Sequence, residues 1–263
     1  MTPERPHPPR SVLDAFGLAG PTLPLAGGQG QAFLADGVVL KWADDRDEAA
    51  FVQDLAARLD PDVVRVPRPV PAGDGSWVHE SWTASEFLPD LTPAAPDWPT
   101  VVRAGAAFAD AATSAVIELD TGVLVNRPHR WARADRCAWG EEVVVLPDRA
   151  EQLQTALRRF TVAGEHQRQV IHADLAGNVL LDATGTPVVV DLSPYLRPVR
   201  WGEAIVVADA VTWLGGPRSL AVTFASDPAG LDLLARALIF RLVAEQLGDL
   251  GTEPSALDPY GRL

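Results

Sequence analysis

The chain has 263 residues, of which 22 are Lys or Arg and 35 are Asp or Glu, so its formal net charge is −13. A chain of this length buries enough surface for one large domain or two small ones without a disulfide or a metal. Because nucleic acids and anionic membranes attract Lys and Arg, the acidic balance disfavours both as partners. It permits a cationic small molecule.

Cysteine usage and hydropathy indicate a cytoplasmic protein. Cys137 is the only cysteine, which excludes an intrachain disulfide and a cysteine-based zinc cluster. The segment MTPERPHPPRSVLDAF lacks the apolar core of a signal peptide. No stretch approaches the roughly 18–20 apolar residues that a transmembrane helix needs. We therefore expect no contact with a membrane.

The first third of the chain has the pattern of a sheet with one long helix. Short strand-like runs broken by glycine extend over 22–42, and Asp36-Gly37 between two of them predicts a hairpin. The apolar spacing over 46–59 predicts a helix, and strand-like runs return over 63–88. We expect residues 1–88 to form a small β-rich lobe.

A change of composition follows this lobe. Residues 89–98 contain three prolines and no periodicity, which is typical of a hinge or linker. A compact β segment, 170–191, is expected within a larger lobe at 99–263. The helices of that lobe are predicted from Ala/Leu/Val-rich patterns at 99–118, 149–164, 201–214 and 229–247. The fold class is therefore α+β with two lobes.

The sequence GGQG at 27–30 is a candidate phosphate-binding loop. Gly27, Gly28 and Gly30 would let main-chain N–H groups approach a phosphate without a side chain in the way. An ordinary turn is the alternative, because paired glycines are also common turn residues. The segment is neither a Walker A loop, since no GK[ST] follows, nor a dinucleotide fingerprint, since Phe33 stands at the third glycine position.

Lys41 is the only lysine among the 22 basic residues. At the end of a strand after the glycine loop, its ammonium group could neutralise nucleotide α/β phosphates. A buried lysine needs a carboxylate partner, and Glu48 shares the inward stripe of the next helix with Val52 and Leu55. In the alternative interpretation, Lys41 is exposed and the two side chains never meet.

Residues 170–194, VIHADLAGNVLLDATGTPVVVDLSP, carry the strongest signal. VLLD and PVVV flank ATGT as a hairpin, which would bring Asn178 and Asp191 side by side. An amide oxygen and a carboxylate suit Mg²⁺, and Asp174 on the same loop could accept a proton from an attacking hydroxyl. Each residue alone could be an ordinary turn residue, because Asx side chains favour turns.

The run from His172 through Asp174 to Asn178, followed by Asp191, resembles the catalytic loop and metal aspartate of the aminoglycoside phosphotransferase and choline kinase group. The resemblance extends from the glycine loop to the catalytic loop and covers most of the chain. It implies a protein kinase-like fold, ATP and Mg²⁺ as cofactors, and transfer of the γ-phosphoryl group to a small-molecule hydroxyl.

The resemblance also implies residue roles. Asp174 would be the catalytic base, assisted by Asn178, while Asn178 and Asp191 would bind Mg²⁺. Lys41, paired with Glu48, would hold the ATP phosphates. His172 and Asp209 would brace the loop. The segment 85–88, which contains Glu86 and Leu88, resembles the connector whose main chain bonds adenine.

Two other classes remain open. The family usually has four residues between base and asparagine, whereas this chain has three, Leu175, Ala176 and Gly177. This favours, as an alternative, an inactive ATP-binding regulatory pseudokinase. A protein-directed kinase is disfavoured, because the helical pattern resumes about ten residues after Asp191 without an activation segment. Net charge does not identify the acceptor, and the oligomeric state is not predicted.

Overall fold

The structure is a computed structural model that describes residues 7–25, 32–164 and 166–248. Its first part is an antiparallel sheet with the strand order β1-β2-β3-β4. The bounds of these strands are β1 (Leu23–Pro24), β2 (Ala32–Ala35), β3 (Val38–Trp42) and β4 (Trp82–Glu86). The predicted hairpin is confirmed: Asp36 and Gly37 join β2 to β3 with φ angles of 48° and 77°. Such left-handed angles are typical of Asp-Gly turns.

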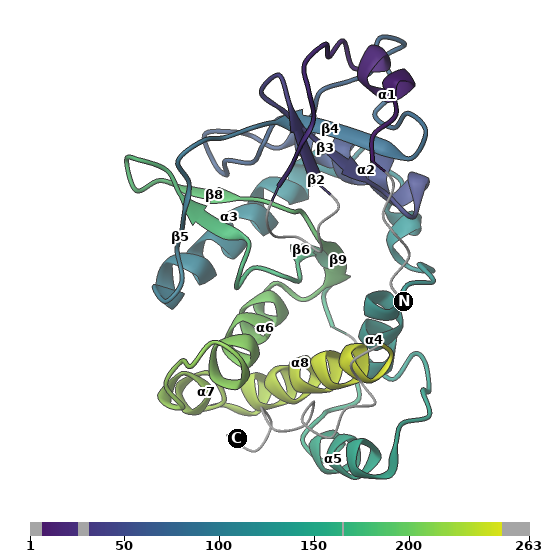
Figure 1. Ribbon diagram of the computed structural model, residues 1–263. Coiled ribbons are helices and arrows are strands. Elements are labelled where there is room, and N and C mark those ends of the chain that lie inside the picture. The colour runs from purple at the N-terminus through teal and green to yellow at the C-terminus, as the bar shows by residue number, and fades with distance from the viewer. Residues whose placement is uncertain (1–6, 26–31, 165, 249–263) are drawn as a thin grey trace.

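One helix precedes this sheet in sequence and another lies between β3 and β4. The short α1 (Arg10–Ala15) places Val12 and Phe16 in the same buried cluster as Leu40 and Trp82. Helix α2 (Arg46–Arg58) begins at Asp45, whose carboxylate accepts from the N–H groups of the first turn. Figure 1 shows α1 and the sheet at one end of the molecule and helices α5, α7 and α8 at the other.

The apolar side of α2 faces the helical part. Phe51 and Leu55 of α2 belong to the same buried cluster as Val101 and Phe108 of α3. Burial of large apolar side chains is the main favourable term in folding, so this shared cluster fixes α2 against α3. A side chain at the start of α2 is thereby held close to the helical part.

The second part is built from helices around α8. The expected helices at 99–118, 149–164, 201–214 and 229–247 are confirmed with shifted ends, and α4 and α7 are additional. A buried cluster of Trp201, Ile205, Ile239 and Leu242 joins α6 to α8. The bounds are α3 (Trp98–Ala115), a 3₁₀ turn η2 (Thr121–Leu124), α4 (Arg130–Ala138), α5 (Asp148–Arg158), α6 (Val199–Thr212), α7 (Ser219–Phe224) and α8 (Pro228–Gln246).

Two small sheets connect these parts. Strands β7 (Val179–Leu181) and β8 (Pro187–Val189) form the predicted hairpin, and β5 (Thr92–Pro93) pairs with β7. The segment 89–98, which the sequence predicts as a hinge or linker, therefore also adds a short strand to the hairpin. Strands β6 (Gln169–His172) and β9 (Pro194–Arg197) pair antiparallel, so the chain before the loop lies beside the chain after Asp191.

The strand-like pattern predicted over 63–88 yields one strand, β4, among the described residues. Residues 76–82, SWVHESW, form only an isolated bridge between His79 and Trp82, and β4 begins at Trp82. Glu80 and Ser81 have φ angles of 45° and 64°, which interrupts extended backbone before β4. None of the helices in the described residues is long and apolar enough to cross a membrane.

Candidate active site

The β7–β8 hairpin brings Asn178 and Asp191 to one end. The N–H of Val190 donates to the Asn178 carbonyl over 2.9 Å, which joins the chain just before β7 to the chain just after β8. Asp191 has a φ of 49°, an angle that Asp tolerates better than most residues. The hairpin thus places Asn178 and Asp191 at the same end, as its sequence predicts.

A tight turn closes the short loop between Asp174 and Asn178. The N–H of Asn178 donates to the Leu175 carbonyl over 2.9 Å. The Asn178 amide nitrogen donates to the Asp174 carbonyl oxygen over 2.7 Å and to its carboxylate over 3.2 Å. Three intervening residues are therefore enough to keep the two side chains in contact.

His172 is a buried side chain that supports this loop. Its side chain is buried, and its Nδ1 accepts the N–H of Asp174 over 3.1 Å. Burial lowers the pKa of His172 from 6.5 to about 4, so the imidazole is neutral at neutral pH. A neutral ring keeps the lone pair that this bond requires. The structure thus places His172 as a support for the loop.

Lys41 reaches the hairpin end across the two parts of the molecule. Its ammonium group forms an ion pair with a carboxylate oxygen of Asp191, 150 residues along the chain. The side chains are 40% and 41% exposed, so the pair is open to a ligand. The glycine loop expected beside Lys41, with Gly27, Gly28 and Gly30, lies outside the described residues.

Glu48 does not pair with Lys41, and this expectation is wrong for the structure. Its carboxylate accepts from Arg127 and lies 3.3 Å from the His129 ring. Burial alone would raise the pKa of Glu48, but the hydrogen bond to His129 and the charge of Arg127 hold it below its usual value. Both partners belong to the segment between η2 and α4, so packing of α2 on the helical part selects them.

A buried ion pair between two helices contacts Asp174. Arg241 of α8 donates to Asp209 of α6 through Nε over 2.7 Å and through Nη2. Nη2 also donates to Asp174 over 2.8 Å. Burial raises the pKa of Asp209 despite the guanidinium, which reflects the apolar surroundings of the pair. Asp209 is among the residues that the sequence predicts for the site, whereas Arg241 and Arg127 are not.

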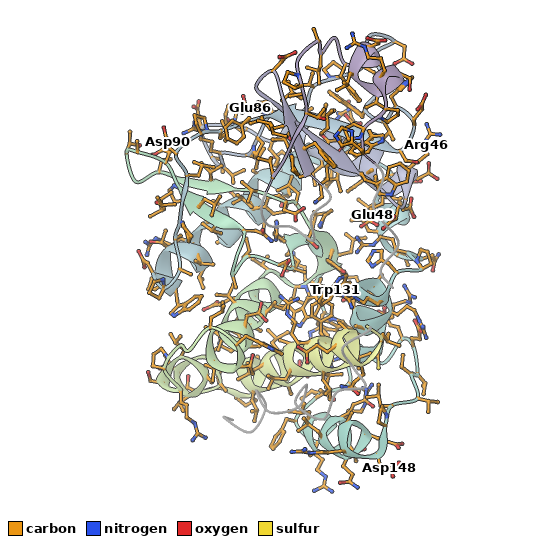
Figure 2. The ribbon with its side chains drawn as sticks, in the orientation of Figure 1. Arg46, Glu48, Glu86, Asp90, Trp131 and Asp148 are labelled. Carbon is orange, nitrogen blue, oxygen red and sulfur yellow. The ribbon has the colours of Figure 1, made fainter. Side chains whose placement is uncertain are left out.

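Part of the expected adenine connector is already hydrogen-bonded within the protein. The main-chain N–H of Glu86 donates to the Arg68 carbonyl over 2.8 Å, so that donor is occupied. The Glu86 carboxylate, at the end of β4 in Figure 2, accepts the N–H of Arg68 over 3.0 Å. Leu88 is partly buried, and no main-chain hydrogen bond joins it to another described residue.

The donor set at the hairpin end fits Mg²⁺. Asp191 offers a carboxylate, and because the Asn178 amide nitrogen is used on Asp174, its amide oxygen is the atom left for a cation. Mg²⁺ takes hard oxygen ligands and completes its octahedron with waters and phosphates, so two protein ligands are enough. Among the described residues no cluster of three or more His, Cys, Asp or Glu side chains could hold a metal alone.

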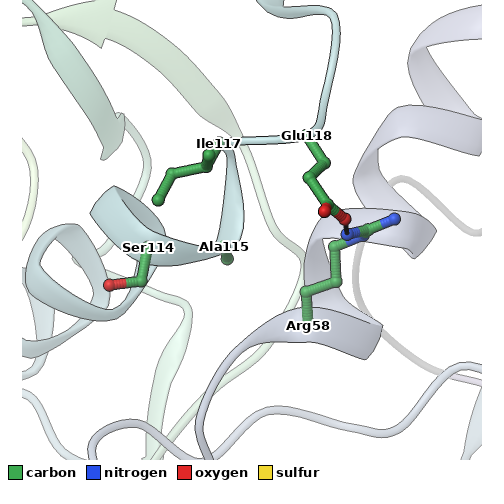
Figure 3. Close-up of a pocket in the computed structure, with 5 residues that line it drawn as sticks. All are labelled: Arg58, Ser114, Ala115, Ile117 and Glu118. Atoms are coloured by element: carbon green, nitrogen blue, oxygen red, sulfur yellow. Dashed lines mark hydrogen bonds and ion pairs between the residues drawn. The ribbon is translucent and has the colours of Figure 1, made fainter.

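Two surface cavities lie apart from these residues. One of about 280 Å³ lies between the ends of α2 and α3, beside the ion pair of Arg58 and Glu118 (Figure 3). Another of about 410 Å³ is lined by α3, α6 and α7 and includes Trp98 and Glu203. Neither is lined by Asp174, Asn178 or Asp191.

Comparison with known proteins identifies the fold. No protein-family model and no curated protein matches the sequence. Solved structures do resemble it. A thermostable mutant of aminoglycoside phosphotransferase APH(4)-Ia, in a ternary complex with ADP and hygromycin B, has 17% identity and a TM-score of 0.60 over 96% of this chain and 95% of that one.

Two further structures extend the comparison. An aminoglycoside phosphotransferase from Alicyclobacillus acidocaldarius has 16% identity and a TM-score of 0.59, over 98% of this chain and 92% of that one. The choline kinase LicA from Streptococcus pneumoniae has 12% identity and a TM-score of 0.54, over 96% of each chain. The fold is therefore the two-lobed, kinase-like α+β fold that the catalytic-loop resemblance implies.

Proposed function

We propose that this protein transfers the γ-phosphoryl group of ATP to a hydroxyl of a small molecule. The observation that carries the proposal is the meeting of Lys41 with Asp191 beside Asn178 and Asp174. These residues come from the sheet, the hairpin and the loop before it. Phosphoryl transfer depends on positioning and charge stabilisation, which such a constellation provides.

The roles follow from the chemistry of each group. Asp174, half exposed at its side chain, accepts the proton of the attacking hydroxyl as the new oxygen–phosphorus bond forms and the bond to ADP breaks. Lys41 exchanges its contact with Asp191 for the nucleotide phosphates. Asn178 and Asp191 would hold Mg²⁺, which neutralises phosphate charge when bound.

The placement of the nucleotide extends this proposal to the domains. ATP would lie between the lobe at 1–88 and the lobe at 99–263, with 89–98 as the connection. Gly27, Gly28 and Gly30 would contact phosphates, and the 85–88 segment would contact adenine through Leu88 rather than the occupied N–H of Glu86. The ADP complex of the aminoglycoside phosphotransferase supports a nucleotide as ligand. A cytoplasmic location suits both ATP and the buried thiol of Cys137.

The acceptor belongs to a broad class. The neighbours that carry the fold argument include phosphotransferases for aminoglycosides and a kinase for choline, both of which are cationic hydroxyl compounds. A small hydroxylated molecule is therefore the proposed acceptor here. The acidic balance of the chain is compatible with a cationic one but does not select it, because the charge is spread over both lobes.

The test is a panel of hydroxylated acceptors with ATP and Mg²⁺. ADP release is measured against the same reaction without acceptor, and Asp174→Ala serves as the inactive control. We expect at least one acceptor to raise ADP release in the parent but not in D174A, while both bind ATP. ATP binding without acceptor-dependent ADP release would contradict the proposal and favour the pseudokinase alternative. Full activity in D174A would refute the role of the base.

A further inference from the structure

The guanidinium of Arg241 bridges two carboxylates, one half exposed (Asp174) and one largely buried (Asp209). Its Nη2 donates to Asp174 over 2.8 Å, while Nε and Nη2 both donate to Asp209. We infer that Arg241 is a positioning residue that orients the Asp174 carboxylate toward the acceptor hydroxyl. This inference rests on the proposed phosphoryl transfer. Arg241 lies 67 residues after Asp174, on α8 at the centre of the helical part.

The guanidinium itself is held rigidly. The side chain of Arg241 is 9% exposed and that of Asp209 is 10% exposed. The guanidinium carbon lies 5.4 Å from the centre of the Trp131 ring and 5.2 Å from that of Phe240. Trp131, labelled in Figure 2, lies on α4 and packs against Phe240 of α8. Because Nε–H and one Nη2–H are directed at Asp209, the second N–H of Nη2 has a fixed direction, and this is the donor that reaches Asp174.

Charge balance explains why this contact orients Asp174 without neutralising it. An unpaired guanidinium beside a catalytic carboxylate would stabilise its ionised form and so make it a poor proton acceptor. Here the carboxylate of Asp209 offsets the Arg241 charge at shorter range, through two hydrogen bonds against one. Arg241 therefore supplies direction more than charge.

The remaining contacts of Asp174 complete the argument. One carboxylate oxygen accepts from Arg241, and the other lies 3.2 Å from the Asn178 amide nitrogen. Its main-chain N–H is bonded to His172. The side chain is nevertheless 50% exposed, so lone pairs remain for an acceptor. Without Arg241, only the longer Asn178 contact restrains rotation of the carboxylate among the described residues.

The test compares two buried arginines of the same helix. Arg236 is 7% exposed at its side chain and pairs with Asp232, and it has no contact with Asp174. Arg241→Gln and Arg236→Gln therefore remove similar buried ion pairs. Turnover is measured with ATP, Mg²⁺ and the panel acceptor that gives the highest ADP release, at a temperature where each variant is folded by circular dichroism.

The expected result separates rate from binding. R241Q should lower kcat about 10- to 100-fold, because a displaced catalytic group costs this much, whereas the KM for ATP and the Kd for ADP stay within about twofold. R236Q should lose stability but keep kcat per folded molecule. Arg241→Lys, which keeps a cation beside Asp209 without the planar fork, should recover stability and keep a lowered kcat.

Each outcome decides the inference. If R241Q folds and its kcat matches that of R236Q, Arg241 has only a structural role and the inference is wrong, while the proposed function stands. If R241Q fails to fold, the same comparison is made with R241K, and parental kcat there overturns the inference. If the parent transfers no phosphate to any acceptor, the proposed function fails and the inference fails with it.

Discussion

Arg127 and Glu48 form an ion pair between the helical part and the first turn of α2. The side chain of Arg127 is 2% exposed, and its guanidinium carbon lies 4.2 Å from the centre of the Tyr195 ring. Its Nε and Nη2 atoms are buried without a hydrogen-bond partner in the described part of the chain. Glu48 is thus the main group that compensates this buried charge, which ties α2 to the segment before α4.

Removal of Arg127 should destabilise the protein strongly. Arg127→Gln leaves Glu48 partly buried with His129 as its one remaining charge partner in the described residues, so we expect the free energy of unfolding to fall by about 2–3 kcal/mol. Urea denaturation measures this loss. Arg58→Gln is the matched control, because Arg58 is 37% exposed and pairs with Glu118 at 77% exposure, and its loss should stay below about 1 kcal/mol. Equal losses in the two variants would show that the Glu48 pair contributes no more than a surface pair.

Lys41 should matter for activity and little for stability. Its ion pair with Asp191 is about 40% exposed on both sides, so Lys41→Met should change the free energy of unfolding by less than about 1 kcal/mol. The same change should raise the KM for ATP and lower kcat/KM at least about tenfold, because the charge that is proposed to face the nucleotide phosphates is lost. Lys41→Arg keeps the charge but changes its shape, so its kcat/KM should lie between those of the parent and of K41M. Steady-state kinetics with ATP would contradict this role if K41M matched the parent.

Asp191 and Asp182 lie at opposite ends of the β7–β8 hairpin, so they allow the proposed metal ligand to be compared with a turn residue. Asp191→Asn should lower acceptor-dependent ADP release about 100-fold and raise the Mg²⁺ concentration for half-maximal rate, because one of the two proposed protein oxygen ligands loses its charge. Asp182→Asn is the control: Asp182 accepts from Thr184 and Thr186 in the turn and pairs with Arg65. The Mg²⁺ titration of D182N should match the parent. A parental Mg²⁺ titration in D191N would remove Asp191 from the metal site.

Local pattern explains which parts of the site are predictable. The hairpin is predicted because its turn and its two strands are contiguous. The tight turn that joins the Asn178 N–H to the Leu175 carbonyl is seen only in the structure. The partner of Glu48 is not predictable this way. Both Lys41 and Arg127 suit its charge, and only the packing of Phe51 against α3 decides between them.

The missed elements have equally specific reasons. Helix α4 has the sequence RWARADRCA. Its three arginines interrupt the apolar pattern, so the buried stripe of Ala134 and Cys137 does not indicate a helix from sequence. The position of Arg241 could have indicated a site residue, because it lies in the apolar sequence of α8, and a buried cation there requires a charged partner. Its two partners, Asp174 and Asp209, are distant in sequence, so no spacing rule identifies them.

The buried imidazole of His172 should make stability depend on pH in the acid range. Burial lowers its pKa from 6.5 to about 4, so between these values the unfolded chain binds a proton that the folded protein does not. Stability therefore falls as the pH drops through this window, by about 2 kcal/mol between pH 7 and pH 5 from this group. Below about pH 4 the folded protein also binds the proton and the loss from this group levels off.

His172→Asn tests this dependence directly. The Asn carbonyl oxygen can accept the N–H of Asp174 in place of Nδ1 but does not titrate, so the variant should lose about 2 kcal/mol less than the parent between pH 7 and pH 5. The free energy of unfolding from urea titrations at both pH values measures the difference. His79→Asn, at a side chain that is 33% exposed, should keep the parental dependence. If H172N and the parent lose the same free energy over this interval, His172 is not the group that is held neutral, and the support of the Asp174 loop has another origin.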